Sequence, residues 1–326
     1  MIKRRTLLLT GLIGVLGAST APTLSVAGAI SEIRIDYATY NPVSLVLKQQ
    51  GLLEKAFAKD GIAIRWVQTL GSNKALEFLN AESIDFGSTA GSAALVARVN
   101  GNPIKAVYVY SAPEWTALVT GKDSPIVKLA DLKGKRIAVT RGTDPHIFLV
   151  RALQEAGLTE KDVKLVLLQH GDGRVALDRG DVDAWAGLDP MMAAAEIENG
   201  DRLFYRNPAA NTFGILNVRE SFAKDHPDIV RKVLAVYETG RKWAIEHPAD
   251  FKKIVVDATR LAPDVVDRQI DQRTDLTQSA IGEPQRRSIL TAGLALRASG
   301  ILPPDTDVEA ALASLIDTQY LAASAN

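Results

Sequence analysis

The sequence predicts an α/β protein built from two similar halves. Segments typical of strands and of helices alternate from residue 32 to about residue 200, and this alternation favours a mostly parallel sheet in each half. One pattern occurs twice, because residues 79–86 (LNAESIDF) are echoed by residues 177–184 (LDRGDVDA). Each copy is preceded by a strand, a polar turn and a helix that ends in Gly-Leu, at residues 33–52 and 136–158. We therefore expect helix starts from both halves to face one cleft.

The first half contains the most informative turn of the chain. Its expected strands cover residues 32–36, 62–68, 84–86, 104–110 and 116–120, with helices over 43–58, from 71 and from 91. The strand at 84–86 is expected to stop at Gly87, which leaves Ser88, Thr89 and Ser92 in a turn before the next helix. Free N–H groups and the positive end of the helix dipole favour an anion there, although ordinary helix capping explains the same residues.

The second half repeats this plan, and an all-helical segment follows it. Its expected strands cover residues 136–140, 163–168, 183–186 and 203–205, and the strand at 213–218 returns to the first half. Helices beginning at Pro, Asp or Ser signals are expected near 221–246, 248–259, 263–275, 284–299 and 305–320. We expect these helices to support the first lobe. The expected division is 1–29 signal peptide, 30–120 first lobe, 121–210 second lobe, and 211–326 return to the first lobe with the C-terminal helices.

The N-terminus is typical of an exported protein. Three cations, Lys3, Arg4 and Arg5, precede an apolar run that is too short to span a membrane. Small residues follow, so cleavage is expected after Ala27 or Ala29, in either the general or the twin-arginine export route. Removal of residues 1–29 takes away three cations and no acids, and it leaves a mildly acidic periplasmic protein.

The composition excludes several classes of function. Lys plus Arg and Asp plus Glu are both 38, so no overall positive charge favours nucleic acid binding. The chain has no cysteine, which excludes disulfides, thiolate metal sites and a cysteine nucleophile. Its four histidines include no pair at metal-ligand spacing, and no nucleotide-binding or hydrolase motif is present. We therefore expect no metal, no cofactor and no catalysis.

Several of these stretches resemble the solute-binding proteins of ABC importers, in the nitrate, sulfonate and taurine branch. The resemblance rests on residues 42–47 (PVSLVL), 83–89 (SIDFGST), 131–135 (DLKGK) and 180–185 (GDVDAW), and it is greatest to the aliphatic sulfonate-binding proteins. It implies a two-lobed, type II venus-flytrap fold in a monomer that delivers a sulfonate to an ABC permease and its ATPase. Taurine, nitrate, bicarbonate and aromatic sulfonates are alternative ligands. An enzyme of this fold and the effector domain of a transcription regulator are alternative classes, which the missing cysteines and the signal peptide oppose.

The resemblance also implies that serine or threonine hydroxyls and backbone N–H groups hold an oxyanion between the lobes. By position it selects the turn at residues 88–90, the helix start at 142–146 and the stretch 184–190. Together with residues expected to face the cleft, the candidates are Tyr40, Asn41, Ser88, Thr89, Ala90, Trp115, Gly142, Thr143, Asp144, His146, Trp185, Asp189 and Phe213. Structural roles compete with this interpretation: an N-cap for Asp189, core packing for Trp115 and Trp185, and hinge packing for Phe213.

Asp144 departs most from the family pattern, which has a hydroxyl residue at this place. A carboxylate beside a bound sulfonate is repulsive unless it caps its own helix or meets a cation of the ligand. Asp144 is therefore expected either to point away from the ligand or to favour an amine-bearing sulfonate such as taurine. Ala90 stands where glycine is common, and Leu188 replaces a frequent tryptophan.

Overall fold

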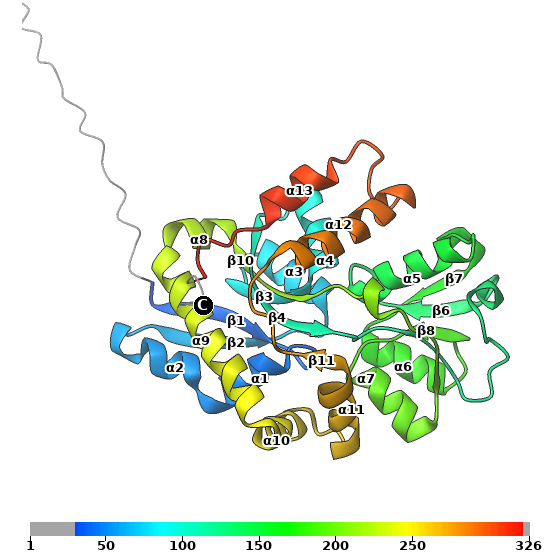
Figure 1. Cartoon of the computed structure of the whole chain (residues 1–326), viewed down its shortest axis with the longest axis horizontal. Coiled ribbons are helices and arrows are strands. Elements are labelled where there is room, and N and C mark those ends of the chain that lie inside the picture. Colours follow the sequence, from blue (N-terminus) through cyan, green and yellow to red (C-terminus); the bar gives the residue numbers. More distant parts are fainter. Residues whose placement is uncertain (1–29, 322–326) are drawn as a thin grey trace, which may run out of the picture.

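Two β-sheets, each flanked by helices, form the two lobes of the protein (Figure 1). The computed structural model describes residues 30–321, and the expected signal peptide lies outside this range. The first sheet contains β1 (Glu32–Tyr37), β2 (Ala63–Gln68), β3 (Phe86–Ala90), β4 (Ile104–Pro113), β10 (Gly214–Arg219) and β11 (Thr274–Asp275). The second contains β5 (Leu118–Thr120), β6 (Arg136–Val139), β7 (Lys164–Leu167), β8 (Ala184–Ala186) and β9 (Arg202–Tyr205).

Both sheets are mixed, whereas the sequence predicted mostly parallel ones. The strand order is β11-β4-β10-β3-β1-β2 in the first sheet and β7-β6-β8-β5-β9 in the second. In each sheet three neighbouring strands run parallel, β2-β1-β3 and β7-β6-β8. The strands added beside them are antiparallel, because the chain crosses between lobes there and returns in the opposite direction.

The repeat seen in the sequence is present in the contacts of the two lobes. Asp85, just before β3, accepts hydrogen bonds from the backbone N–H and the guanidinium of Arg34 on β1. Asp183, just before β8, accepts the same two bonds from Arg136 on β6. Each aspartate N–H in turn donates to the carbonyl oxygen of its arginine, at 2.7 and 2.8 Å. Equivalent ion pairs therefore occur in the two lobes, which confirms the prediction of two similar halves.

The strand that the sequence ended at Gly87 is longer than expected. β3 continues through Ser88 and Thr89 to Ala90, so these residues lie in a strand and not in a turn. The reason is the return strand β10, which pairs antiparallel with β3 along this whole length. Helix α4 (Gly91–Val99) follows at once.

Most helices were expected, with two breaks. The helices of the first lobe and the C-terminal segment are α1 (Pro42–Gln50), α2 (Leu52–Phe57), α3 (Ser72–Asn80), α4 (Gly91–Val99), α8 (Glu220–Asp225), α9 (Pro227–Glu246), α10 (Pro248–Thr259), α11 (Pro263–Arg273), α12 (Glu283–Ala298) and α13 (Val308–Leu315). The second lobe contains α5 (Asp144–Glu155), α6 (His170–Asp178) and α7 (Met191–Ala194), which continues as a π-helical turn, Ala195–Asn199. The expected helix 43–58 is divided at Gly51, whose φ of 61° is a left-handed cap. The expected helix 221–246 is divided before Pro227.

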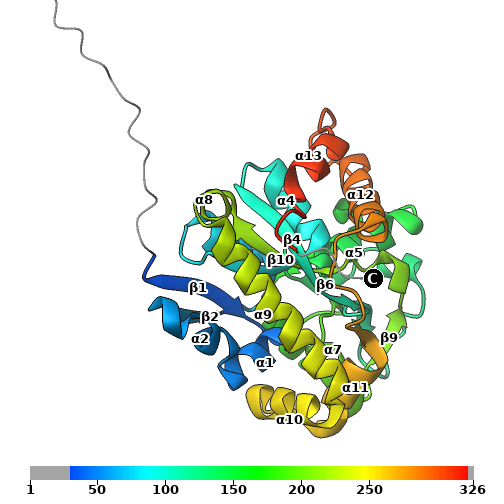
Figure 2. The same ribbon diagram turned by 60° about the vertical axis from the view of Figure 1, so that its left-hand side comes forward.

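The C-terminal helices contact both lobes and not only the first. Helix α9 lies across the first sheet (Figure 2) and packs on α1 and β4. Helix α12 packs on α5 of the second lobe, where Ala292 and Leu296 meet Ile147 and Val150. Helix α11 packs on α7 of the second lobe through Val265. These helices therefore reach across from the first lobe on two sides.

Two connecting segments, residues 114–117 and 206–213, join the lobes. The lobe boundaries stay a prediction, but the residues of β5 pair with β8 and β9 in the second sheet, whereas the sequence assigned residues 118–120 to the first lobe. The chain thus first crosses directly after β4.

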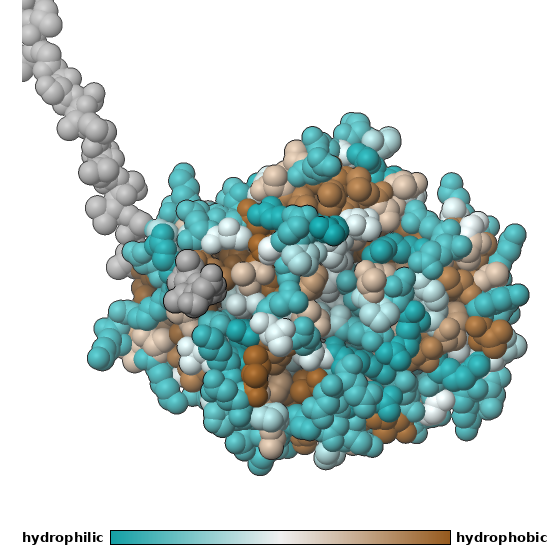
Figure 3. Space-filling view, viewed as in Figure 1, coloured by the Kyte–Doolittle hydropathy of each residue, from teal (hydrophilic) through white to brown (hydrophobic). Residues whose placement is uncertain are grey.

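The face of the molecule shown in Figure 3 is mainly polar. On this face, hydrophobic residues form separate patches among hydrophilic ones. Across residues 30–321, the helices are all too short or too polar to cross a bilayer.

Candidate ligand-binding site between the lobes

A buried carboxylate organises the first-lobe side of the cleft. Asp36, at the end of β1, accepts hydrogen bonds from Ser88 N–H (2.9 Å), Ser88 Oγ (2.8 Å) and Thr69 Oγ1 (2.8 Å). Burial raises the pKa of Asp36 to about 6, against the lowering effect of these three donors. Asn41 donates to Ser88 Oγ as well (2.8 Å), and its Oδ1 caps α1 through Ser44 N–H. The Ser88 hydroxyl is therefore engaged inside the first lobe.

Tyr40 belongs to the same network, while Thr89 and Ala90 do not. The Tyr40 hydroxyl donates to the Ser88 carbonyl oxygen (3.0 Å) and lies 3.0 Å from Thr69 Oγ1. The Thr89 hydroxyl is on the other face of β3, where it accepts a hydrogen bond from Asn217 (2.7 Å). Ala90 N–H donates to Ser72 Oγ at the start of α3 (3.0 Å). Asp36, which the sequence analysis missed, is thus the centre of a network that uses three of the expected ligand-binding side chains.

Asp144 extends from the start of α5 in the second lobe and meets donors from outside that lobe. Its Oδ1 accepts from Ser92 Oγ (2.5 Å) and Thr212 Oγ1 (2.8 Å). Its Oδ2 accepts from Trp115 Nε1 (2.8 Å) and Thr212 N–H (2.9 Å). Ser92 lies in the first turn of α4, and Trp115 and Thr212 lie in the two connecting segments. Asp144 is 2% exposed, and its four donors use the acceptor capacity of both oxygens.

The start of α4, which the sequence predicted to bind an anion, therefore binds a carboxylate of the protein itself. The first turn of α4 offers Ser92 to the carboxylate of Asp144 rather than to a free ligand. The expectations for Asp144 stay predictions, and its side chain binds Ser92, Trp115 and Thr212. It ties the second lobe to the first lobe and the connecting segments.

Aromatic stacking joins the two networks. The ring of Tyr40 meets that of Trp115 edge-on, with centroids 6.2 Å apart, and Trp115 also contacts Tyr110. Such pairs contribute about 0.5–1.5 kcal/mol beyond the burial of their area. Trp115 is therefore both a packing residue and a hydrogen-bond donor in the cleft.

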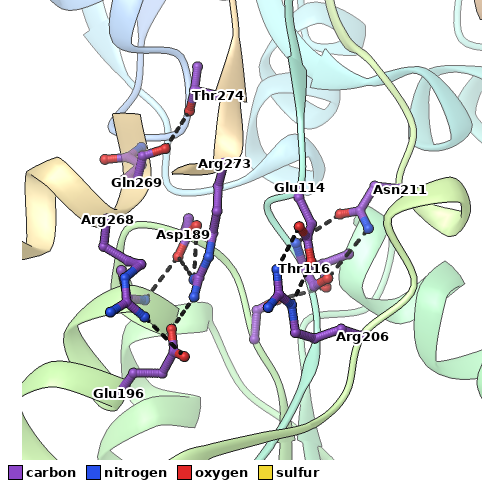
Figure 4. Close-up of polar contacts among 12 residues, drawn as sticks. Glu114, Thr116, Asp189, Glu196, Arg206, Asn211, Arg268, Gln269, Arg273 and Thr274 are labelled. Carbon is purple, nitrogen blue, oxygen red and sulfur yellow. Dashed lines mark hydrogen bonds and ion pairs between the residues drawn. The ribbon is translucent and has the colours of Figure 1, made fainter. Parts of the chain in front are cut away.

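Asp189 takes part in a second link between the lobes (Figure 4). It accepts a hydrogen bond from Ala193 N–H on α7 (2.9 Å) and pairs with Arg273 at the end of α11 (3.2 Å). Arg273 also pairs with Glu196, which contacts Arg268 at 3.4 Å. Burial raises the pKa of Asp189 to about 6, and Arg273 opposes that shift. Asp189 is thus held by helix N–H and ion-pair contacts, close to the capping role considered from sequence.

The connecting segments are fastened to each other beside this link. Figure 4 shows Glu114 facing Arg206, which it binds through both carboxylate oxygens at 2.7 and 2.8 Å. Thr116 N–H donates to Asn211 Oδ1 at 2.9 Å. The two crossings therefore run side by side and are hydrogen-bonded as a unit.

Four expected site residues lie away from these networks. His146 is buried against Glu160 of its own lobe (2.8 Å), and this hydrogen bond lowers the pKa of Glu160. Trp185 is enclosed in the core of the second lobe beside Gly173. Thr143 donates its hydroxyl to the Thr140 carbonyl oxygen (2.6 Å). Phe213 lines a pocket beside the connecting segments, with Pro113, Thr212 and Ser288 among its walls.

The last feature of the cleft is a group of buried polar atoms that lack partners. His170 begins α6 and is 1% exposed, yet neither ring nitrogen has a hydrogen-bond partner within residues 30–321. Asn73 Oδ1, in the first turn of α3, is also buried without a partner in that range. A Cβ built on Gly71 would lie 2.8 Å from Asn73 Oδ1 and 3.1 Å from His170 Nε2, and one on Gly142 would lie 3.7 Å from Asn73 Cβ. The starts of α3, α5 and α6 therefore converge across the cleft.

Sequence reasoning missed His170, which is not among the candidate site residues. The available signal was its place directly after the second-lobe strand at 163–168, which corresponds to the place of Gly71 after the first-lobe strand at 62–68. Within residues 30–321, acidic and histidine side chains form no cluster that could hold a metal ion.

A two-lobed α/β fold with facing helix starts and paired crossings defines a periplasmic-type binding protein. The chain belongs to the NMT1/THI5-like family, whose model matches residues 55–251. It is 31% identical over 235 residues to an Escherichia coli (strain K12) protein named for binding aliphatic sulfonates, covering 72% of this chain and 73% of that one. A Bacillus subtilis (strain 168) protein of the same designation is 26% identical over 252 residues, 76% of each chain.

Solved structures support the same assignment of fold. The alkanesulfonate-binding protein SsuA from Xanthomonas axonopodis pv. citri, bound to MOPS, matches with a TM-score of 0.79 and 26% identity over 88% of this chain and 98% of that one. The periplasmic aliphatic sulphonate-binding protein SsuA from Escherichia coli matches with a TM-score of 0.74 and 26% identity, over 88% and 92% of the two chains. The predicted fold class is thus confirmed. A desulfurization enzyme, DSZB, shares the fold at 15% identity, which shows that the fold alone does not decide between binding and catalysis.

Proposed function

We propose that this protein is the periplasmic solute-binding component of an ABC importer and captures aliphatic sulfonates between its two lobes. The observation that carries the proposal is the 31% identity to a relative named for aliphatic sulfonates, with matching coverage of both chains. The two related structures that bear the SsuA name add the fold and, in one of them, a bound sulfonate buffer. The partners would be a permease and its ATPase, and the protein would bind its ligand without transforming it.

The chemistry of the cleft supports a sulfonate. A sulfonate carries one delocalised charge and accepts hydrogen bonds without donating any at neutral pH. Helix starts supply N–H donors and positive potential without a paired cation, so they suit such a group. The starts of α3, α5 and α6 lack side-chain caps, and they converge between the lobes.

Taurine is the second candidate. A taurine-binding periplasmic protein of Escherichia coli (strain K12) is 30% identical over 183 residues, which is 55% of this chain and 57% of that one. The carboxylate expected to bind the taurine ammonium, Asp144, is already surrounded by four donors. This arrangement favours sulfonates without an amine.

The test is calorimetric titration of the chain from residue 30, after removal of bound ligand, with butanesulfonate, taurine, nitrate and sulfate. Binding of butanesulfonate with little response to sulfate supports the proposal. Ligand at about 100 times its dissociation constant should also add about 2.7 kcal/mol to the free energy of unfolding. A response to taurine alone would favour the second candidate, and no response to any sulfonate would refute the assignment.

A further inference from the structure

Two groups of helix starts face the cleft, and the positive end of one of them is already neutralised by the carboxylate of Asp144. The first turn of α4, with Thr212 and Trp115, surrounds the carboxylate of Asp144. A sulfonate placed against the same donors would displace this carboxylate or lie beside it, and both outcomes are unfavourable for two like charges. The headgroup of a ligand therefore needs another place.

The starts of α3 and α6 lack side-chain capping bonds, and the acidic residue in their first turns is the exposed Asp172 of α6. Each helix has nine residues, and neither N-cap residue, Gly71 nor Gln169, makes a side-chain capping bond. The two starts approach closely, since a Cβ on Gly71 would lie only 3.1 Å from His170 Nε2. This contact brings two positive helix ends together, which an anion beside them would stabilise.

Side chains at these two helix starts have buried polar atoms without a hydrogen-bond partner, which a ligand would supply. His170 is enclosed with two unpartnered ring nitrogens, and Asn73 holds an unpartnered amide oxygen, as judged over residues 30–321. Leaving such buried groups unpaired is unfavourable, because they lose their hydrogen bonds to water. Turning the Asn73 amide presents its NH₂ group instead, because the two amide orientations occupy the same volume. Ser72 Oγ accepts from Ala90 N–H and retains its own proton for donation.

We infer that the sulfonate headgroup binds between the starts of α3 and α6, where His170 and Asn73 are its side-chain donors, and not at the Ser88–Thr89 segment. This inference rests on the proposed function. It makes His170 a specificity-determining residue on the second lobe and Asn73 its counterpart on the first. A headgroup held by both would favour the arrangement in which the lobes meet.

The charge at the proposed site depends on His170 and on the charged residues of the neighbouring elements. Burial alone lowers the pKa of its imidazole to about 3. The charged residues on the neighbouring elements are engaged or exposed: Lys74 pairs with Glu77 on α3 at 2.6 Å, Arg141 lies 3.6 Å from Glu160, and Asp172 on α6 itself is exposed. An anion beside His170 therefore favours the imidazolium, in which both ring nitrogens donate.

The experiment is calorimetric titration of butanesulfonate into the parent protein and three variants. His170→Leu keeps the volume without a donor, His170→Gln keeps one donor, and His247→Gln changes an exposed histidine that stacks on Trp243. We expect His170→Leu to weaken binding on the order of 10- to 100-fold, His170→Gln to weaken it less, and His247→Gln to leave it unchanged.

Each outcome decides between distinct conclusions. Equal affinity of the parent and His170→Leu overturns the placement of the headgroup and leaves the proposed function standing. No binding of butanesulfonate or taurine by the parent refutes the proposed function and this inference with it. If His170→Leu fails to fold by circular dichroism, the imidazole ¹⁵N signals of the parent decide. Those of His170 should move on addition of butanesulfonate while those of His247 stay, and unmoved His170 signals overturn the inference.

Discussion

His170 should make the protein lose stability in mild acid, and replacing it with glutamine should remove that loss. An unfolded histidine has a pKa near 6.5, whereas burial lowers the pKa of His170 in the folded protein to about 3. Between these values the unfolded chain binds a proton that the folded protein does not. The stability due to the neutral imidazole is therefore present above pH 6.5 and is lost as the pH falls toward 3.

The magnitude follows from the shift of the pKa. Each unit between the pH and 6.5 costs about 1.4 kcal/mol, so the loss between pH 8 and pH 5 is about 2 kcal/mol, and near pH 3 it approaches ~5 kcal/mol. Asp36 and Asp189 act in the opposite direction, because burial raises the pKa of each to about 6 and favours the folded state in acid. Only a comparison between variants separates these contributions.

Urea unfolding at pH 8 and pH 5 provides that comparison. When the pH falls from 8 to 5, the unfolding free energy of the parent should decrease by about 2 kcal/mol more than that of His170→Gln. His247→Gln, which changes an exposed histidine, should behave like the parent. Equal pH dependence of the parent and His170→Gln would show that His170 is hydrated or paired in solution, and the reasoning from its burial would be wrong.

Further substitutions test the two links between the lobes and the network of Asp36 inside the first lobe. Asp144→Asn should cost about 2–4 kcal/mol in urea unfolding, since an amide nitrogen would face N–H donors such as Trp115 Nε1; a cost below about 0.5 kcal/mol would contradict the network. Arg273→Met should cost about 3–5 kcal/mol, because it leaves Asp189 buried without its cation, and adding Asp189→Asn should restore part of this; an additive double variant would argue against direct coupling. Asp36→Asn should remove a loss of about 3 kcal/mol that the parent undergoes as the pH rises from 3.5 to 8, and an unchanged pH profile would speak against the raised pKa of this carboxyl.

The sequence was sufficient for the architecture because local patterns determine it. The echo of residues 79–86 in 177–184 corresponds to the paired contacts Arg34–Asp85 and Arg136–Asp183, which each lobe forms independently. The helix starts near Gly71 and Gly91 were placed correctly for the same reason. The extension of β3 was not, because it depends on pairing with β10, more than 120 residues later in the chain.

The cleft was harder to predict because its contacts join distant segments. The donors of Asp144 come from residues 92, 115 and 212, and no spacing in the sequence relates them. Ser88 was expected to face a ligand, but the carboxylate of Asp36 takes its hydroxyl. His170 gave no periodic signal, and its contact with Gly71 joins residues that are far apart in the sequence.

The contact of Asp144 has a consequence for the empty protein. A ligand is usually what makes the closed form of such a molecule more populated than the open form. Here the polypeptide contributes its own anion to the contact between the lobes, so we expect closed molecules even before a ligand binds. Every 1.4 kcal/mol from Asp144 raises the ratio of closed to open empty molecules tenfold and tightens ligand binding by up to the same factor, as long as the open form predominates. Closure of the empty protein and its affinity for a ligand would thereby rise together through one side chain.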